Sequence, residues 1–175
     1  MNWESARLPD IARPGLDVIF IGINPGRRSA EIGHHFGGVN NHFWRLLYES
    51  GWTPRLLKPE EDALLLEYGI GLTNLAPRAT RSASDLTGEE MEAGGAALRE
   101  KLLLWRPKIA CFLGKAPYAY FAGVPAARVP WGRQPLPVAA GVVEFVAPNP
   151  SGRSTIPYPE RLRALKEVRS LREGL

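Results

Sequence analysis

Four apolar stretches, separated by polar segments, predict the buried strands of the fold. They cover about 18–23, 69–75, 108–113 and 142–147. The first, Val-Ile-Phe-Ile-Gly-Ile, has no polar residue at alternate positions, which is typical of a strand that other layers cover on both faces. Gly, Asn or Pro follows each stretch closely, and these residues stop a strand ladder.

Between these stretches, apolar residues recur at helical spacing. One predicted helix carries its apolar face at Phe43, Trp44, Leu47 and Tyr48. Asn40 or Asn41 can cap its start, and Gly51 ends it. Thr87 and Glu90 form a capping box for a longer helix that runs to about residue 105. The other predicted helices cover about 59–68, 117–121 and the segment from 159 onward, where Leu162, Leu165 and Val168 face inward.

This alternation of strands and helices predicts an α/β fold, a three-layer sandwich with a central, mainly parallel four-stranded sheet. The Pro-rich segment 124–137 is predicted to be loop or edge structure, and segment 1–15 an irregular lead-in without chemistry. With 175 residues the chain is long enough for one well-buried domain and short for two. We therefore expect a single domain over 1–175.

Composition and charge exclude several classes of protein. No apolar run approaches the roughly 20 residues that span a bilayer, and the N-terminus lacks a leader pattern, so we expect a cytoplasmic protein without membrane contact. The net charge of +4 permits a polyanionic partner. Cys111 is the single cysteine, which excludes disulfides, and its apolar neighbours predict a buried, inert thiol. Three histidines without ligand spacing predict no metal site.

The arginines of the last helix form a separate group. They are Arg161, Arg163, Arg169 and Arg172. Most of them are interpreted as a solvated helix face.

Two strands end in Asn-Pro turns, which carry the candidate chemistry. Asn24 lies in the Gly-Ile-Asn-Pro-Gly turn at 22–26, and Asn149 lies in the turn at 148–153. Ligands bind at the carboxyl edge of parallel sheets, so we expect both turns to lie together there. Segment 27–40 is long for a loop between a strand and a helix, which favours a functional loop. Taken alone, the first turn is more typical of an ordinary strand-to-loop connection.

Six short motifs follow one another between residues 15 and 155. They are Gly-Ile-Asn-Pro-Gly at 22–26, Gly-His-His-Phe at 33–36, Asn-His-Phe-Trp at 41–44, Tyr-Gly-Ile-Gly-Leu-Thr-Asn at 68–74, Gly-Lys at 114–115 and Asn-Pro-Ser-Gly at 149–152. Together they resemble the mismatch-specific uracil-DNA glycosylase and thymine-DNA glycosylase family, within the wider uracil-DNA glycosylase superfamily. Their order and spacing make this resemblance specific.

The resemblance implies a uracil-DNA glycosylase-like fold and a DNA repair activity. The enzyme would hydrolyse the N-glycosidic bond of uracil, with thymine or related damaged pyrimidines as further candidates, opposite guanine in double-stranded DNA. This step starts base excision repair, and we expect a monomer that needs no cofactor and has no lyase activity. The bond cannot be reached inside the stack, so the nucleotide must be flipped out.

The resemblance also implies roles for single residues. Asn24 matches the catalytic Asn, whose amide oxygen would hold a water near the sugar carbon. Phe36 matches the position that stacks on the flipped base, with core packing as the alternative. His35 matches a pocket position, with a metal ligand or a surface histidine as alternatives. The remaining base-pocket positions are Ile23, Ser29, Asn74, Thr80 and Asn149. Ser29 would lie beside the 5-position of the base, and for Asn74 and Thr80 local turn hydrogen bonds are the alternative.

Loop 149–153 matches the loop that enters the duplex and fills the gap left by the flipped nucleotide. Arg153 falls on the wedge position, where a guanidinium can stack between bases. Ser151 and Lys115 would contact phosphate. The DNA-contacting positions are Lys115, Pro150, Ser151, Gly152 and Arg153.

The motifs mix two branches of the family, because segment 149–152 is similar to the uracil type, whereas segment 33–36 and Arg153 are similar to the thymine type. Thymine as a substrate therefore stays open. Two other functions also stay open. A non-catalytic module that binds DNA mismatches or lesions would use the same wedge and stacking residues. An enzyme that acts on free nucleosides would show weak salt dependence, whereas duplex binding weakens steeply with salt.

Overall fold

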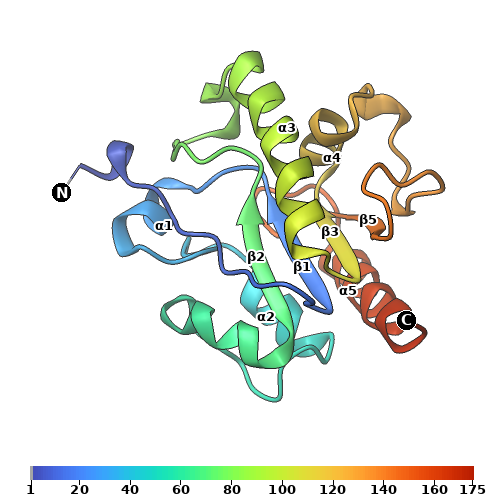
Figure 1. The fold of residues 1–175 in the computed structure, drawn as a ribbon. Coiled ribbons are helices and arrows are strands. Elements are labelled where there is room, and N and C mark those ends of the chain that lie inside the picture. The colour runs from blue at the N-terminus through green and yellow to red at the C-terminus, as the bar shows by residue number, and fades with distance from the viewer. Residues whose placement is uncertain (1) are drawn as a thin grey trace.

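A central five-stranded sheet organises the computed structural model, which describes residues 2–175 (Figure 1). Its parallel strands are β1 (Val18–Gly22), β2 (Ile70–Asn74), β3 (Ile109–Leu113) and β5 (Val143–Ala147). The short strand β4 (Gly132–Arg133) runs antiparallel along β5, which gives the order β2-β1-β3-β5-β4. The predicted α/β fold with a mainly parallel sheet is confirmed.

The sheet has one strand more than the four that the sequence predicts. The additional strand, β4, has only two residues, Gly132 and Arg133, and lies inside the Pro-rich segment 124–137. Neither an apolar run nor a period of two can mark so short a strand. Its position at the edge of the sheet agrees with the interpretation of this segment as loop or edge structure.

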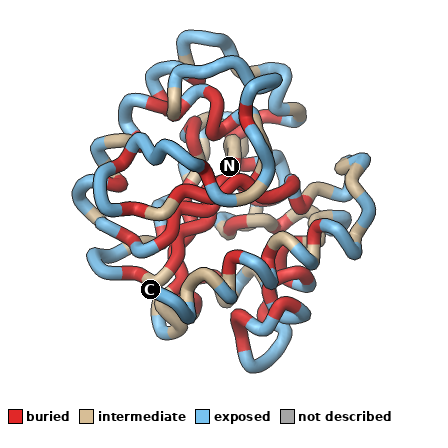
Figure 2. Tube along the Cα trace, turned by 90° about the vertical axis from the view of Figure 1, so that its right-hand side faces the viewer, coloured by how far each residue is buried: buried red, intermediate tan, exposed pale blue. Residues whose placement is uncertain are grey.

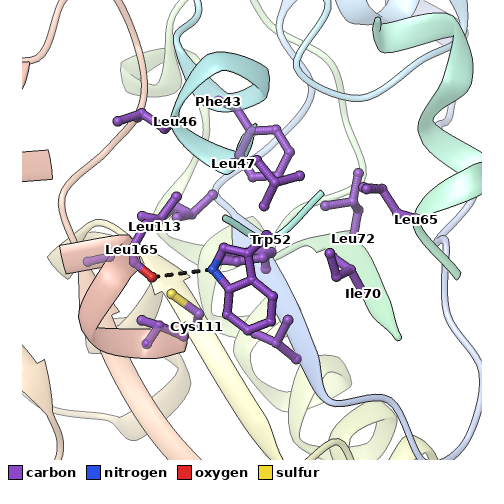
Figure 3. Close-up of a cluster of buried hydrophobic side chains, with 14 of the residues drawn as sticks. Phe43, Leu46, Leu47, Trp52, Leu65, Ile70, Leu72, Cys111, Leu113 and Leu165 are labelled. Carbon is purple, nitrogen blue, oxygen red and sulfur yellow. Dashed lines mark hydrogen bonds between the residues drawn. The ribbon is translucent and has the colours of Figure 1, made fainter. Parts of the chain in front are cut away.

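One face of the sheet packs against α2 (Phe43–Glu49) and α5 (Tyr158–Glu173). Phe20 of β1 enters this layer, where its ring meets the indole of Trp52 edge to face at 5.8 Å. The indole N–H also donates a hydrogen bond of 3.3 Å to the carbonyl of Leu165 in α5 (Figure 3). Trp52, just beyond α2, therefore ties this helical layer to the sheet.

The opposite face packs against α3 (Gly88–Trp105) and α4 (Lys115–Ala122). Ile19 and Ile21 of β1 enter this layer, because successive side chains of a strand point to opposite faces. β1 is buried along its whole length, and Figure 2 shows the buried residues concentrated along the middle of the molecule. The three-layer arrangement is therefore confirmed.

Two predicted segments differ in local structure. Segment 27–40 does not begin as an irregular loop, because α1 (Arg27–Ile32) forms its first half. The helix has no apolar periodicity, and Gly33, at a left-handed φ of 75°, ends it. The predicted helix over 59–68 is a 3-10 helix, η2 (Pro59–Tyr68). Three shorter 3-10 turns are η1 (Trp3–Ser5), η3 (Ala83–Asp85) and η4 (Ala126–Arg128).

The predicted capping box of α3 is confirmed, whereas the N-cap residue of α2 is His42, one residue after the predicted Asn41, and its side chain makes no cap hydrogen bond within residues 2–175. The side chain of Asn41 accepts a hydrogen bond of 2.9 Å from the backbone N–H of Phe43, at the start of α2. Thr87 and Glu90 exchange hydrogen bonds of 3.1 and 2.8 Å between side chain and backbone, which makes the predicted capping box of α3. Tyr48, in contrast, does not join the buried face of α2, because 43% of its surface is exposed.

The thiol of Cys111 is fully buried in the sheet, and this burial raises its pKa far above the ordinary value. The predicted inert thiol is confirmed. In the last helix, Leu165 and Val168 are buried as predicted, and Leu162 is partly buried against the same core. Arg161 is also buried and is the exception among the four arginines, most of which were predicted to form a solvated helix face.

The parallel strands end at one edge of the sheet. Gly22 pairs with Asn74 at the ends of β1 and β2, and Leu113 pairs with Ala147 at the ends of β3 and β5. The segments that follow these strands therefore start side by side. This edge is where ligands bind in parallel sheets.

Within residues 2–175, no helix combines the length and the apolar composition that crossing a membrane would require.

Candidate functional site

The segments after the parallel strands enclose a cavity of about 500 Å³, a size typical of ligand sites. All predicted site residues except Lys115 and Gly152 line it. They are Ile23, Asn24, Ser29, His35, Phe36, Asn74, Thr80, Asn149, Pro150, Ser151 and Arg153. These residues come from five separate stretches of the chain, and the strand ends bring them together.

Asn24 follows β1, and its orientation is fixed by two hydrogen bonds. Its side-chain nitrogen Nδ2 lies 2.9 Å from the carbonyl oxygen of Arg78 and 2.7 Å from Oγ1 of Thr80. A carbonyl can only accept, and the Thr80 hydroxyl already donates to the carbonyl of Ser82 at 2.7 Å. Both partners therefore require the NH₂ group of Asn24. The amide oxygen Oδ1 forms no hydrogen bond within residues 2–175, and the side chain lines the cavity.

The carbonyl that holds Asn24 belongs to a residue that is itself held in place. The guanidinium of Arg78 donates to both carboxylate oxygens of Glu90, at 2.5 and 2.9 Å, and to the carbonyl of Asp85 at 2.9 Å. Glu90 is the capping-box residue of α3, and these hydrogen bonds hold its pKa at about 2. The start of α3 thus supports the orientation of Asn24 through Arg78.

Phe36 makes the core contact that is one of its two predicted alternatives, and stacking on a flipped base stays a prediction. Its ring stacks on Phe43 of α2 with centroids 4.0 Å apart and planes at 20°, and it also lines the cavity. Its φ of 51° is left-handed, which is strained for a residue with a side chain and common at ligand sites. Gly22 lies beside it, where a Cβ atom would come within 2.6 Å of Oδ1 of Asn74 and 3.7 Å of the Phe36 ring. Glycine at this position keeps the cavity open between Phe36 and Asn74.

His35 is buried, which rules out the surface alternative. Its Nε2 lies 2.8 Å from the carbonyl oxygen of Pro9, so Nε2 carries the proton and Nδ1 keeps its lone pair. Burial lowers the pKa of His35 below its ordinary value of 6.5. The Asp62 carboxylate accepts the His35 backbone N–H at 3.0 Å and lies 3.1 Å from the His34 ring. An uncharged imidazole therefore forms this part of the wall.

Ser29 and Asn74 border the same cavity with different partners. The Ser29 hydroxyl accepts a hydrogen bond of 2.9 Å from the backbone N–H of Gly37. This bond connects α1 to the segment that follows it. The Asn74 side chain makes no hydrogen bond within residues 2–175, so the local turn bonds considered as its alternative are not formed. Thr80 makes the local bond to Ser82 and also contacts Asn24.

Hydrogen bonds within loop 149–153 fix its backbone, and the tip of the loop is exposed. Oδ1 of Asn149 accepts from the backbone N–H of Ser151 at 2.7 Å, and Oγ of Ser151 accepts from the N–H of Arg153 at 3.2 Å. Gly152 approaches segment 40–42 so closely that a Cβ atom would lie 2.5 Å from the carbonyl oxygen of Asn40. The Arg153 side chain forms no ion pair within residues 2–175, and the residue is exposed at the cavity.

Lys115 lies outside the cavity. Its ammonium group sits over the ring of Trp131, 4.7 Å from the centroid, a distance typical of a cation–π contact. Trp131 precedes β4, and 48% of its surface is exposed. Lys115 is thus at the same edge of the sheet as Asn149, because the adjacent Gly114 has its Cβ position 4.0 Å from the Asn149 Cβ.

The charges around the cavity have one sign. The lining cations are Arg27, Arg28, Arg81 and Arg153. Within residues 2–175 no Asp, Glu or Lys side chain lines the cavity. Arg27 and Arg28 pair with Glu31 of α1, so Arg81 and Arg153 are the lining arginines that most favour an anionic ligand. A water held in this cavity would have only neutral groups as hydrogen-bond acceptors.

Several contributors were not predicted. Leu8 lines the cavity and Pro9 holds His35, although segment 1–15 was interpreted as a lead-in without chemistry. Segment 81–83 also lines the cavity. Ile11 pairs with Leu72 of β2, which fixes the lead-in along the edge of the sheet. The Pro residues of segment 1–15 indicate irregular structure, but no local pattern shows which strand end it reaches.

The described part of the chain has no group of three or more His, Cys, Asp or Glu side chains that could hold a metal ion. The cavity can instead supply a neutral hydrogen-bonding amide, an aromatic face and a cationic rim.

Comparison with known families agrees with this geometry. The model of the uracil DNA glycosylase superfamily matches residues 9–170, which include every residue of the cavity named above except Leu8.

Proposed function

This chain belongs to the uracil DNA glycosylase superfamily, whose members act on DNA as glycosylases, and from this premise we propose that it removes uracil paired with guanine in double-stranded DNA. The observation that carries the proposal is Asn24, whose hydrogen bonds fix its nitrogen and leave its oxygen free in the cavity. Thymine is a slower substrate in this proposal, because its 5-methyl group makes it a poorer leaving group than uracil and would have to fit beside Ser29, which lines the cavity.

The Asn24 oxygen holds the attacking water. An amide oxygen accepts a hydrogen bond but is a far weaker proton acceptor than a carboxylate. Because no carboxylate lines the cavity, the water is oriented and hardly activated. The reaction therefore depends on departure of the base. The C1′–N1 bond breaks, its electron pair leaves with the uracil anion, and the water oxygen then bonds to C1′ and releases a proton to solvent.

The flipped base would lie against the cavity wall. The ring of Phe36 provides a stacking face, with Phe43 stacked behind it at 4.0 Å. The uncharged His35 and the amides of Asn74 and Asn149 provide polar groups at its rim. Backbone N–H donors directed at the base would stabilise the charge on the leaving uracil, as in an oxyanion hole.

Arg153 is the proposed wedge. It is exposed at the tip of loop 149–153, beside the cavity into which the nucleotide would flip. A guanidinium can stack between base pairs and donate hydrogen bonds to guanine. Removing a base from a mismatch costs less unstacking energy than removing it from a normal pair, which favours substrates paired with guanine.

We propose a monofunctional enzyme that acts as a monomer. A lyase step needs an amine that attacks C1′ and forms a Schiff base. No lysine of residues 2–175 lines the cavity, and Lys115 faces Trp131.

The proposal is tested by single-turnover release of base from DNA containing G·U, A·U, G·T or single-stranded U. We expect G·U to be cut fastest, A·U and G·T more slowly, and no strand cleavage before alkali treatment. In a second series opposite guanine, 5-fluorouracil should leave faster than uracil, because it is the better leaving group.

Binding of the G·U duplex without release of any base would contradict the proposal and favour a non-catalytic mismatch-binding module. Rates that do not rise with the acidity of the leaving base would contradict the departure-driven mechanism.

A further inference from the structure

Arg161 is an unusual residue of α5. Only 4% of its surface is exposed, yet its guanidinium forms no ion pair with a carboxylate within residues 2–175. Its Nε atom is buried and has no hydrogen-bond partner among the described residues 2–175. Burial of a charged group without a counter-charge is unfavourable, so such a group is retained for a reason other than simple packing.

The two terminal nitrogens of Arg161 connect two segments on the rim of the cavity. One nitrogen donates to the carbonyl of Ser151 at 3.3 Å, and the other lies 3.0 Å from Nδ1 of His42. A guanidinium only donates, so Nδ1 of His42 accepts and its ring proton lies on Nε2. The backbone N–H of His42 in turn donates to the carbonyl of Pro150 at 2.9 Å. Arg161, His42 and loop 149–153 thus form a closed set of hydrogen bonds.

An aromatic ring supports this set from α5. The ring of Tyr158 packs edge to face on His42 at 5.7 Å and lies 5.6 Å from the Arg161 guanidinium. Tyr158 is itself fixed, because its hydroxyl donates to Glu49 of α2 at 2.5 Å and the Arg45 guanidinium lies 4.4 Å from its ring. Both helices of this layer therefore hold the position of Arg161.

We propose that Arg161 is a positioning residue that holds loop 149–153 in the shape needed to enter the duplex. The inference rests on the proposed glycosylase function and adds a residue to it. Arg161 touches neither the base nor the reacting atoms, and it does not line the cavity. It acts through the backbone of Pro150 and Ser151, so that loop 149–153 keeps its conformation when its tip contacts DNA.

The helix offers a matched control. Arg163 lies two residues further along α5 and is exposed, so Arg163→Met removes the same charge without touching loop 149–153. Arg161→Lys keeps the charge but loses the forked geometry that reaches two acceptors. His42→Phe keeps an aromatic ring and removes the Nδ1 acceptor, which tests the same contact from the other side.

The experiment measures three quantities for each variant. They are the thermal midpoint, the dissociation constant for a duplex with a tetrahydrofuran abasic site opposite guanine, and the single-turnover rate on G·U duplex and on single-stranded U. We expect Arg161→Met to weaken abasic-duplex binding about tenfold, because loop 149–153 would then have to be ordered when it binds. Arg161→Lys and His42→Phe should lie between this variant and the wild type, and Arg163→Met should stay within about twofold, as expected for a surface charge.

The ratio of duplex to single-strand rate separates positioning from general loss of structure. A lower ratio in Arg161→Met supports the proposal, because single-stranded DNA does not need the wedge. Equal loss on both substrates, or abasic-duplex binding no weaker than that of Arg163→Met, would overturn it. If Arg161→Met does not fold, His42→Phe gives the same comparison. A wild type that binds duplex but releases no uracil would refute the proposed function, while the binding comparison would still decide the role of Arg161.

Discussion

Asn24 illustrates how the neighbours of an amide decide its chemistry. A side-chain amide has a donor end and an acceptor end, and either can face a ligand. Here the Arg78 carbonyl and the Thr80 hydroxyl both accept hydrogen bonds from the NH₂ group, because the Thr80 proton is already donated to Ser82. The oxygen is therefore the end left for a water. A carboxylate at this position would lack the donors that these two partners require.

The Thr80 hydroxyl is the contact that can be removed without changing the shape of the residue. Thr80→Val should lower the single-turnover rate on G·U about fivefold, because a hydrogen bond worth about 1 kcal/mol no longer orients Asn24. Binding of the abasic duplex should stay unchanged, since Thr80 is buried and touches no wedge residue. Thr73→Val on β2 is the control for the loss of a buried threonine hydroxyl that does not contact Asn24. Equal rates for Thr80→Val and the wild type would contradict this role of Thr80.

His35 should make the stability of the fold depend on pH. Burial lowers its pKa below 6.5, so the unfolded chain binds the proton more readily than the folded one. The stabilisation is complete above pH 6.5 and is lost as the pH falls below it, towards the folded-state pKa. The carboxyls of Glu61 and Glu90, whose pKa values are about 2, change their stabilising contribution only below about pH 4.5.

Urea unfolding at about pH 5.5 and pH 7.5 tests this expectation. The wild type should have a lower midpoint at the acid pH, and His35→Gln, which can still donate to Pro9 but does not titrate, should show a smaller difference. The same pH dependence in both proteins would rule out His35 as its source.

At the scale of elements, the start of α3 and the segment before it act together. Glu90 caps the helix and also holds Arg78, whose carbonyl orients Asn24. The helix N-terminus is therefore part of the support of the site, although its capping box alone indicates only a helix start. Loop 149–153 is supported in the same way, from Arg161 in α5.

Glu90→Gln tests this support. It replaces one carboxylate oxygen by an NH₂ group and so removes one of the two acceptors for Arg78. Because this ion pair is exposed to solvent, stability should fall only slightly. The single-turnover rate should fall by a few fold, while abasic-duplex binding is retained. Thr87→Ala, which removes only the cap, is the control for helix stability, and a rate loss as large in this control would contradict the role of Arg78.

At the scale of the whole molecule, local patterns predicted the layers well. Apolar runs marked the four parallel strands because burial on both faces leaves little place for polar residues. The capping box at Thr87 depends on residues three apart, so it is visible in the sequence. The short strand β4 and helix α1 have too few residues to show a period.

The site was predicted where strand ends and motifs mark it, and missed where distant segments meet. Asn24 follows an apolar run and can be found from that position. Leu8 reaches the cavity only because the lead-in crosses the edge of the sheet at Ile11. Arg161 resembles every other arginine of its helix, and only the packing of α5 against segment 40–42 makes it different. Such contacts are long-range and leave no local signal.

Asn24 is proposed to position the attacking water at the carboxyl edge of the sheet. The most direct test is single-turnover release of uracil from a G·U duplex by the wild type and by Asn24→Ala, with abasic-duplex affinity measured for both. We predict that Asn24→Ala loses about a hundredfold in rate, as expected when the group that positions the attacking water is removed, and keeps its affinity. Rates within about twofold of each other would contradict the claim, because orientation by one hydrogen bond alone is worth more than that.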